Sequence, residues 1–214
     1  LVNMHYEISH PQLLEIRNGT YAETTFGPDQ VWYPDRWLRK SGCGPTSASL
    51  LMAYYAFTRP ELRSLYIADD LTRHSFIRQM QEMSRFIKPG MMGVDKISKY
   101  VDGVIQFANE KGITLSPHVF EVGEKNNGRG NELQRLADFV SKGLSSDSPL
   151  GFLVLSRGNE THLQNWHWIT VTGTDITEDA ILATASDEGK KITFDLSLWY
   201  HTTSMNSGLV YFTA

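Results

Sequence analysis

SGCGPTSAS, residues 41–49, contains the only cysteine of this 214-residue chain. Cys43 lies between two glycines and shortly before Pro45, a residue favoured in the first turn of a helix. The pattern therefore predicts a helix that begins near Cys43. The free amides and the positive dipole end of a helix start favour the thiolate form of a cysteine. Because Gly42 and Gly44 carry no side chain, we expect a substrate backbone to approach Cys43 closely.

The pattern of apolar residues changes from helical to strand-like along the chain. Ala48, Leu51, Met52 and Tyr55 recur at helical spacing after Cys43 and predict a helix with one buried face. From residue 113 onward, short runs rich in Val, Ile, Thr and Phe alternate with turn residues. We expect one α+β domain over residues 1–214, with a helical part over about 41–112 packed on an antiparallel sheet over about 113–214. Predicted helices cover 45–57, 61–69, 75–87, 94–111, 131–143 and 195–201, and predicted strands cover 116–122, 150–156, 167–174, 180–185, 191–194 and 208–213.

His167 is the best of the seven histidines to serve as a base for Cys43. It begins a strongly β-prone segment directly after a polar loop, and strand ends hold side chains rigidly. A thiolate needs such an imidazole as its ion-pair partner and as the acid that protonates the leaving group. His162 ranks second because it lies in the loop itself. A hydrogen-bonded core histidine at 167 and an inert buried cysteine at 43 are the structural alternatives.

Asp187 is the predicted partner of the second imidazole nitrogen. The strand over 180–185 can return antiparallel to the His167 strand through a turn near 175–179, which brings Asp187 back to the end where His167 begins. A carboxylate at that point would hold the imidazole in one tautomer. Asn165 and Asp179 are weaker candidates, and an exposed turn carboxylate is the alternative interpretation of Asp187.

Composition and charge limit the classes of molecule that we expect this protein to bind. The formal net charge is −4 and the basic residues are scattered, so nucleic acid is not an expected partner. The longest apolar runs, 49–57 and 150–155, are too short to cross a bilayer, which takes ~20 residues. A lone cysteine and scattered histidines show no ligand spacing, so neither a metal nor a cofactor is expected. The first residues lack a secretory signal pattern, which favours the cytoplasm, although a signal removed upstream of Leu1 also fits secretion.

Together these residues resemble the papain-like fold of clan CA cysteine peptidases, and within it the peptidase C-thirty-nine-like group. Its best-known members are the bacterial peptidases that remove double-glycine leaders at bacteriocin exporters. The matching segments are 41–48, the strand over 149–155, the segment 167–173, and the acid-bearing turn 186–191 with its returning strand. The resemblance covers residues from about 30 to the C-terminus and implies a Cys43, His167, Asp187 triad. It implies cleavage of a peptide or isopeptide bond in a peptide or protein substrate through a thioester.

The sequence departs from this group at the oxyanion hole. Many members carry a glutamine six positions before the nucleophile, where this chain has Trp37. The indole N–H of Trp37 is one candidate donor, and Gln30 is another if the segment 32–35 loops back. The departure leaves two further hypotheses open: a catalytically inactive peptide-binding domain, and an acyltransferase or transglutaminase of the same fold.

Overall fold

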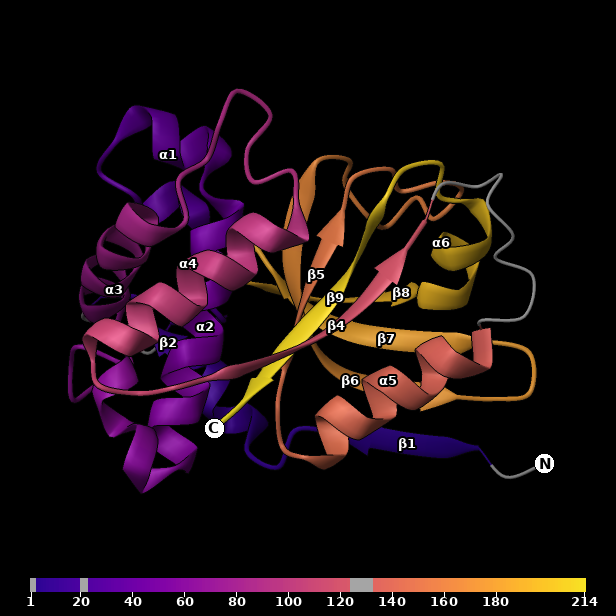
Figure 1. The fold of residues 1–214 in the computed structure, drawn as a ribbon, viewed down its shortest axis with the longest axis horizontal. Helices are drawn as coiled ribbons and strands as arrows, with labels where there is room; N and C mark the ends of the chain where they lie inside the picture. Colours follow the sequence, from indigo (N-terminus) through magenta and orange to yellow (C-terminus); the bar gives the residue numbers. More distant parts are fainter. Residues whose placement is uncertain (1–2, 20–22, 124–132) are drawn as a thin grey trace.

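A computed structural model describes residues 3–19, 23–123 and 133–214. These residues form helices and a seven-stranded sheet whose strand pairs are all antiparallel, in agreement with the predicted α+β class. Helices α1 to α4 gather on one side of the molecule, and the sheet with α5 and α6 forms the other (Figure 1). The helices are α1 Arg36–Ser41, α2 Cys43–Thr58, α3 Arg73–Phe86, α4 Ile97–Glu110, α5 Leu133–Ser145 and α6 Leu196–Thr202, with 3-10 helices η1 Pro11–Leu14, η2 Gln30–Trp32 and η3 Pro60–Leu65. The strands are β1 Met4–Glu7, β2 Glu15–Arg17, β3 Thr24–Phe26, β4 Ser116–Val122, β5 Leu150–Val154, β6 His167–Ile176, β7 Ile181–Asp187, β8 Lys190–Asp195 and β9 Ser207–Thr213.

All six predicted strands are present, in the sheet order β4-β9-β5-β6-β7-β8. Strand β6 is long enough to pair with β5 through its first half and with β1 through its last four residues. Because β1 comes from the N-terminus, the expectation that the sheet begins near residue 113 was wrong. The small β2–β3 sheet was also not predicted, because strands this short carry too few residues for an alternating pattern.

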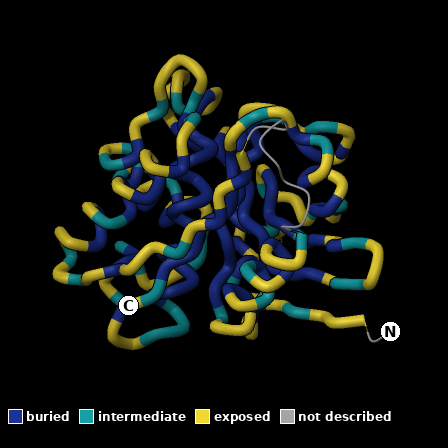
Figure 2. The backbone as a smooth tube through the Cα atoms, turned by 45° about the vertical axis from the view of Figure 1, so that its right-hand side comes forward, coloured by how far each residue is buried: buried dark blue, intermediate teal, exposed yellow. Residues whose placement is uncertain are grey.

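Helix α2 is buried on all sides, not along one stripe as its spacing predicted. Every residue from Cys43 to Ala56 is buried. The helix packs against β5 and β6 on one side and against α3, α4 and η3 on the other, so the two halves of the protein share it as a common core. Figure 2 shows this buried centre as the dark blue part of the tube.

The helix predicted at 61–69 is a short 3-10 helix, η3, that ends at Leu65. The side chain of Gln79 takes the place of further helical turns, since its Nε2 donates to Leu65 O and its Oε1 accepts from Ile67 N. The predicted helix over 131–143 is α5, although its first two predicted residues lie outside the described part of the chain.

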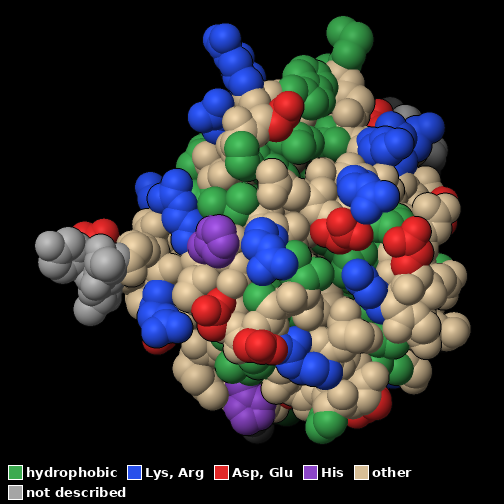
Figure 3. Space-filling model, turned by 90° about the vertical axis from the view of Figure 1, so that its left-hand side faces the viewer, with side chains coloured by type: hydrophobic (Ala, Val, Ile, Leu, Met, Phe, Trp, Pro, Cys, Tyr) green, Lys and Arg blue, Asp and Glu red, His purple; other side chains and the backbone are tan. Residues whose placement is uncertain are grey.

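The surface carries mixed charge, as the sequence predicted. On the helical face, Lys and Arg side chains lie among Asp and Glu, and hydrophobic side chains gather at its upper end (Figure 3). Among the described residues, no helix has the length and apolar character that crossing a membrane requires.

Candidate active site

Cys43 is the first residue of α2, as the sequence predicted. Gly42 forms a single-residue break between α1 and α2, and its carbonyl accepts hydrogen bonds from Thr46 N and Thr46 Oγ1 at 3.1 and 2.7 Å. These bonds close the first turn of α2. They fix the thiol at the positive end of a 16-residue helix, where a thiolate is stabilised.

The two glycines beside Cys43 allow close packing within the protein. A side chain at Gly42 would come within 2.5 Å of Leu38 O, and one at Gly44 within 2.7 Å of Val94 Cγ2. Neither glycine lines the pocket around Cys43. The expected role of Gly42 and Gly44 in substrate approach is therefore replaced by a packing role. They let α2 begin where α1 and the segment before α4 lie in close contact with it.

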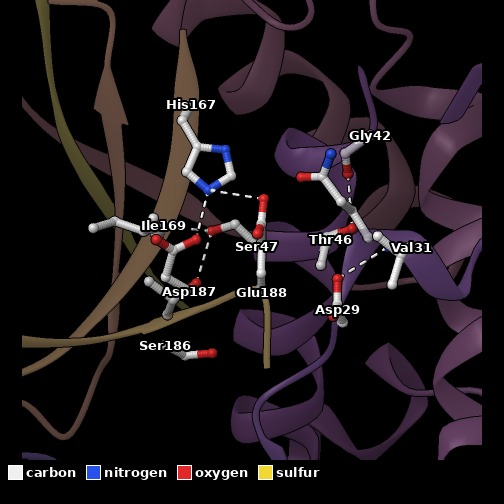
Figure 4. A network of polar contacts seen from close by, with 12 residues as sticks. Asp29, Val31, Gly42, Thr46, Ser47, His167, Ile169, Ser186, Asp187 and Glu188 are labelled. Atoms are coloured by element: carbon white, nitrogen blue, oxygen red, sulfur yellow. Dashed lines mark hydrogen bonds and ion pairs between the residues drawn. The ribbon is translucent and has the colours of Figure 1, made fainter. Parts of the chain in front are cut away.

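His167 and Asp187 meet through the predicted hairpin. His167 begins β6 and Asp187 ends β7, and the two strands pair antiparallel with a shift in register between Val171 and Gly173. His167 Nε2 lies 2.6 Å from Asp187 Oδ1, and both side chains are buried, 7% and 8% exposed. Figure 4 shows the imidazole reaching from β6 to the Asp187 carboxylate. The hydrogen bond fixes the ring orientation and occupies Nε2. Nδ1 is then available for a hydrogen bond to a second partner.

Cys43 and His167 line the same pocket, which has a volume of about 20 Å³, room for about one water molecule. Nδ1 of His167 faces the side of the pocket on which Gly42 lies, and Cys43 follows Gly42 in the chain (Figure 4). Both side chains are largely buried, with Cys43 at 6% exposure, so only a small opening reaches the sulfur. The other lining residues are Pro28, Gln30, Thr46, Ser47, Leu50, Trp168, Ile169, Thr170, Ser186 and Glu188.

The pKa of His167 is strongly perturbed by its surroundings. Burial by itself lowers this pKa, but hydrogen bonds to Asp187 and Cys43, together with the negative charges of both, outweigh burial and raise it from 6.5 to about 10. These surroundings favour the cationic form of the imidazole. A cation in that position stabilises a thiolate and can protonate a leaving group.

Further carboxylates lie close to the pair. Glu188 Oε1 is 4.0 Å from His167 Nε2, too far for a hydrogen bond, and Glu188 adopts a positive φ of 50° in the β7–β8 turn. The pKa of Asp29 is raised chiefly by burial, and the charge of Asp187 adds to this effect.

His167, Asp187 and Glu188 also bring possible metal-ligand atoms within 4.8 Å of one another. A metal on Nε2 would have to break the 2.6 Å hydrogen bond to Asp187, so we interpret the group as an imidazole and its orienting carboxylate.

Of the two candidate oxyanion donors, the structure brings only Gln30 to the pocket. Its Nε2 donates to Arg39 O at 3.0 Å because the chain after η2 loops back along α1, and within the described residues its buried Oε1 has no hydrogen-bond partner. Trp37 lies on the outer face of α1 with 47% exposure and does not line the pocket. The short helix α1 turns Trp37 outward while its C-terminal end leads into Cys43, so the indole is not positioned as a donor.

The secondary candidates lie elsewhere. His162 Nδ1 bonds to the buried Glu160 at 2.7 Å with its own side chain mostly exposed. Asn165 Oδ1 accepts from Arg157 N and closes the loop before β6. Asp179 lies in the turn at the opposite end of β6.

Pro28 and Gln30 of the segment 24–30 line one side of the pocket, and the sequence did not reveal how this segment packs on the β7–β8 turn. Phe26 N donates to Gly189 O at 2.8 Å, and Ser186 Oγ donates to Phe26 O at 2.6 Å, so this segment clamps the β7–β8 turn. Gly27 has a positive φ of 81°, and a side chain there would overlap Ser186 Oγ. The Gly27-Pro28 dipeptide was the available signal, because it marks a turn, but it gives no indication of what the turn packs against.

Comparison with known proteins adds no family assignment. No protein-family model matches this chain, and no curated protein matches it in sequence.

Proposed function

We propose that this protein is a papain-like cysteine hydrolase that cleaves peptide or isopeptide bonds. The observation that carries the proposal is the His167 imidazole, which binds Asp187 through Nε2 and shares a buried pocket with the thiol of Cys43. The division into a helical part and an antiparallel sheet, with α2 between them, supports the papain-like assignment.

The reaction begins with the thiolate–imidazolium pair. The Cys43 sulfur attacks the carbonyl carbon of the scissile amide, and the carbonyl electrons move to oxygen. As the intermediate collapses, the C–N bond breaks and His167 delivers its proton to the departing amine. Water then attacks the thioester, the neutral imidazole takes its proton, and the carboxylic acid leaves as the thiolate–imidazolium pair re-forms. Asp187 holds the ring through both steps.

Gln30 is the proposed side-chain donor to the oxyanion. It is buried, it lines the pocket with Cys43, and its amide carries a second N–H besides the one used by Arg39 O. Oxyanion stabilisation by a donor fixed before the reaction is among the largest contributions to acyl-transfer catalysis.

The first experiment tests the chemistry without knowledge of the substrate. The rate of Cys43 alkylation by iodoacetamide is measured from pH 4 to 9 in the native protein and in His167→Gln. We expect rapid alkylation of the native protein from mildly acidic pH, and in His167→Gln a profile shifted toward alkaline pH. A thiol that is unreactive across this range, or equally reactive in both proteins, would refute the proposed function.

Analysis of the reaction products distinguishes hydrolysis from acyl transfer and from peptide binding without turnover. A digest of a synthetic peptide library is analysed by mass spectrometry for the native protein and for Cys43→Ala. Free carboxyl products that depend on Cys43 support a hydrolase. Products joined to an added amine indicate acyl transfer, and peptide binding that survives in Cys43→Ala without any turnover indicates an inactive binding domain.

A further inference from the structure

A second, larger groove begins one residue away from His167. It is lined by the N-terminal end of α4, the ends of β4 and β5, the start of β9 and Trp166, and it has a volume of about 730 Å³. Its lining combines the apolar residues Ile97, Val122, Leu153, Leu155, Trp166 and Met205 with the charged residues Asp95, Lys96 and Glu121 and with polar residues. This space is large enough for several side chains of an extended peptide.

The groove and the catalytic pocket are lined by different residues, but two of these residues are consecutive in the chain. Trp166 lines the groove and His167 lines the pocket, while Trp168 Nε1 donates to Val94 O at 2.7 Å between them. Asp95, the residue after Val94, lines the groove as well. Because Trp166 and His167 are adjacent in the chain, a peptide bound at His167 and Cys43 would pass close to Trp166.

Trp166 is held in an unusual conformation at this junction. Its φ is +54°, a value that is rare for a bulky residue and costs conformational energy. Two hydrogen bonds maintain it: Trp166 N donates to Leu155 O at 3.0 Å, and Arg157 N donates to Asn165 Oδ1 at 2.9 Å. The indole remains 39% exposed. The fold thus presents a large apolar side chain, directly before the catalytic histidine, that a ligand can cover.

From this geometry we infer that Trp166 and the groove it borders select an apolar side chain next to the scissile bond of a polypeptide substrate. The inference rests on the proposed function, since it assigns the substrate class of the same site. An apolar side chain packed on the indole would remove the remaining apolar surface of Trp166 from water. A polar or charged side chain would lose its hydration there without gaining a partner on the indole face.

The test compares three proteins on one randomised peptide library: the native protein, Trp166→Ala and Trp37→Ala. Trp37 is the matched control, because it is a similarly exposed tryptophan that lines neither the pocket nor the groove. We expect the native protein and Trp37→Ala to cleave with a preference for apolar residues at one fixed position. Trp166→Ala should reduce kcat/KM for those peptides about tenfold and remove the preference. Alkylation of Cys43 by iodoacetamide should stay within about twofold of the native rate in all three, since this small reagent does not need the groove.

The outcomes distinguish the two proposals. If the native protein cleaves peptides but shows no apolar preference, or if Trp166→Ala keeps that preference, the inference about the groove is overturned while the proposed function stands. If Trp166→Ala also loses Cys43 alkylation, the residue maintains the catalytic pair and does not select substrate, and the inference is overturned as well. If the native protein cleaves no peptide, the proposed function is refuted. The inference about the groove, which rests on it, is then refuted as well.

Discussion

Replacing Asp187 by Asn tests how strongly the charge of this carboxylate stabilises the protonated imidazole of His167. Asn has the same shape and its Oδ1 can still accept from His167 Nε2, so the change removes the negative charge and keeps the hydrogen bond. A hydrogen bond to a charged group is worth about 1.5–3 kcal/mol and a neutral one about 0.5–1.5 kcal/mol. The midpoints of these ranges differ by about 1 kcal/mol, and 1.36 kcal/mol corresponds to one pKa unit. We expect the pKa of His167 to fall by about one unit from its native value of about 10.

The measurement is an NMR titration of the imidazole carbon of His167, identified by its absence in His167→Gln. The same variant series is followed by unfolding in urea at several pH values. The native pKa of His167 is raised above its ordinary 6.5, so the stabilisation it contributes is complete below about pH 6.5 and is lost as the pH rises toward 10. Asp187→Asn should therefore lower the free energy of unfolding by about 1–3 kcal/mol at pH 6. The difference from the native protein should narrow as the pH approaches 10.

The chain supplies a matched control on the same strand. His5 Nδ1 lies 2.8 Å from Asp175 Oδ1, at the far end of β6, but both side chains are more than half exposed. Because exposed pairs contribute about 0–1 kcal/mol, Asp175→Asn should change stability by less than about 1 kcal/mol and leave the His167 titration unchanged. If His167 titrates at the same pH in the native protein and in Asp187→Asn, the carboxylate does not stabilise the imidazolium and the reasoning is refuted.

Further predictions concern the oxyanion donor and the segment 24–30. Gln30→Ala should lower kcat by about 10²–10³-fold while Cys43 stays open to alkylation, and Trp37→Ala should leave kcat unchanged; a kcat that depends on Trp37 and not on Gln30 would reverse the assignment. Gly27→Ala should lower the free energy of unfolding by about 2–4 kcal/mol, because the new methyl group would overlap Ser186 Oγ at a positive φ. Gly112→Ala is its control: the φ is also positive at 74°, but no atom of the described residues lies within 4 Å of the added methyl group, so urea unfolding should show a loss of only about 1 kcal/mol. Equal losses at the two glycines would show that backbone conformation alone, without the contact, sets the cost.

The pairing of His167 with Asp187 was predictable because it is local. The two residues are joined by one antiparallel hairpin, and strand alternation together with turn residues indicates both the strands and the direction of return. The start of α2 at Cys43 was predictable for a similar reason, since glycine and proline restrict backbone conformation at their own positions. The burial of α2 on every side was not predictable. The spacing of its apolar residues indicates one buried stripe and does not indicate how many elements surround the helix.

The sequence by itself determined the elements whose signals lie within a single strand, helix or hairpin: helix α2, the strands of the main sheet from β4 onward, and the residues at their ends. Only the tertiary structure decided that Gln30 reaches the pocket while Trp37 faces outward, that the segment 24–30 packs on the β7–β8 turn, and that Trp166 opens onto a groove. The physical reason is that periodic patterns arise from repeated backbone geometry, whereas the path of an irregular segment depends on contacts with distant parts of the chain. Residues brought together by such a path carry no common spacing from which their meeting can be predicted.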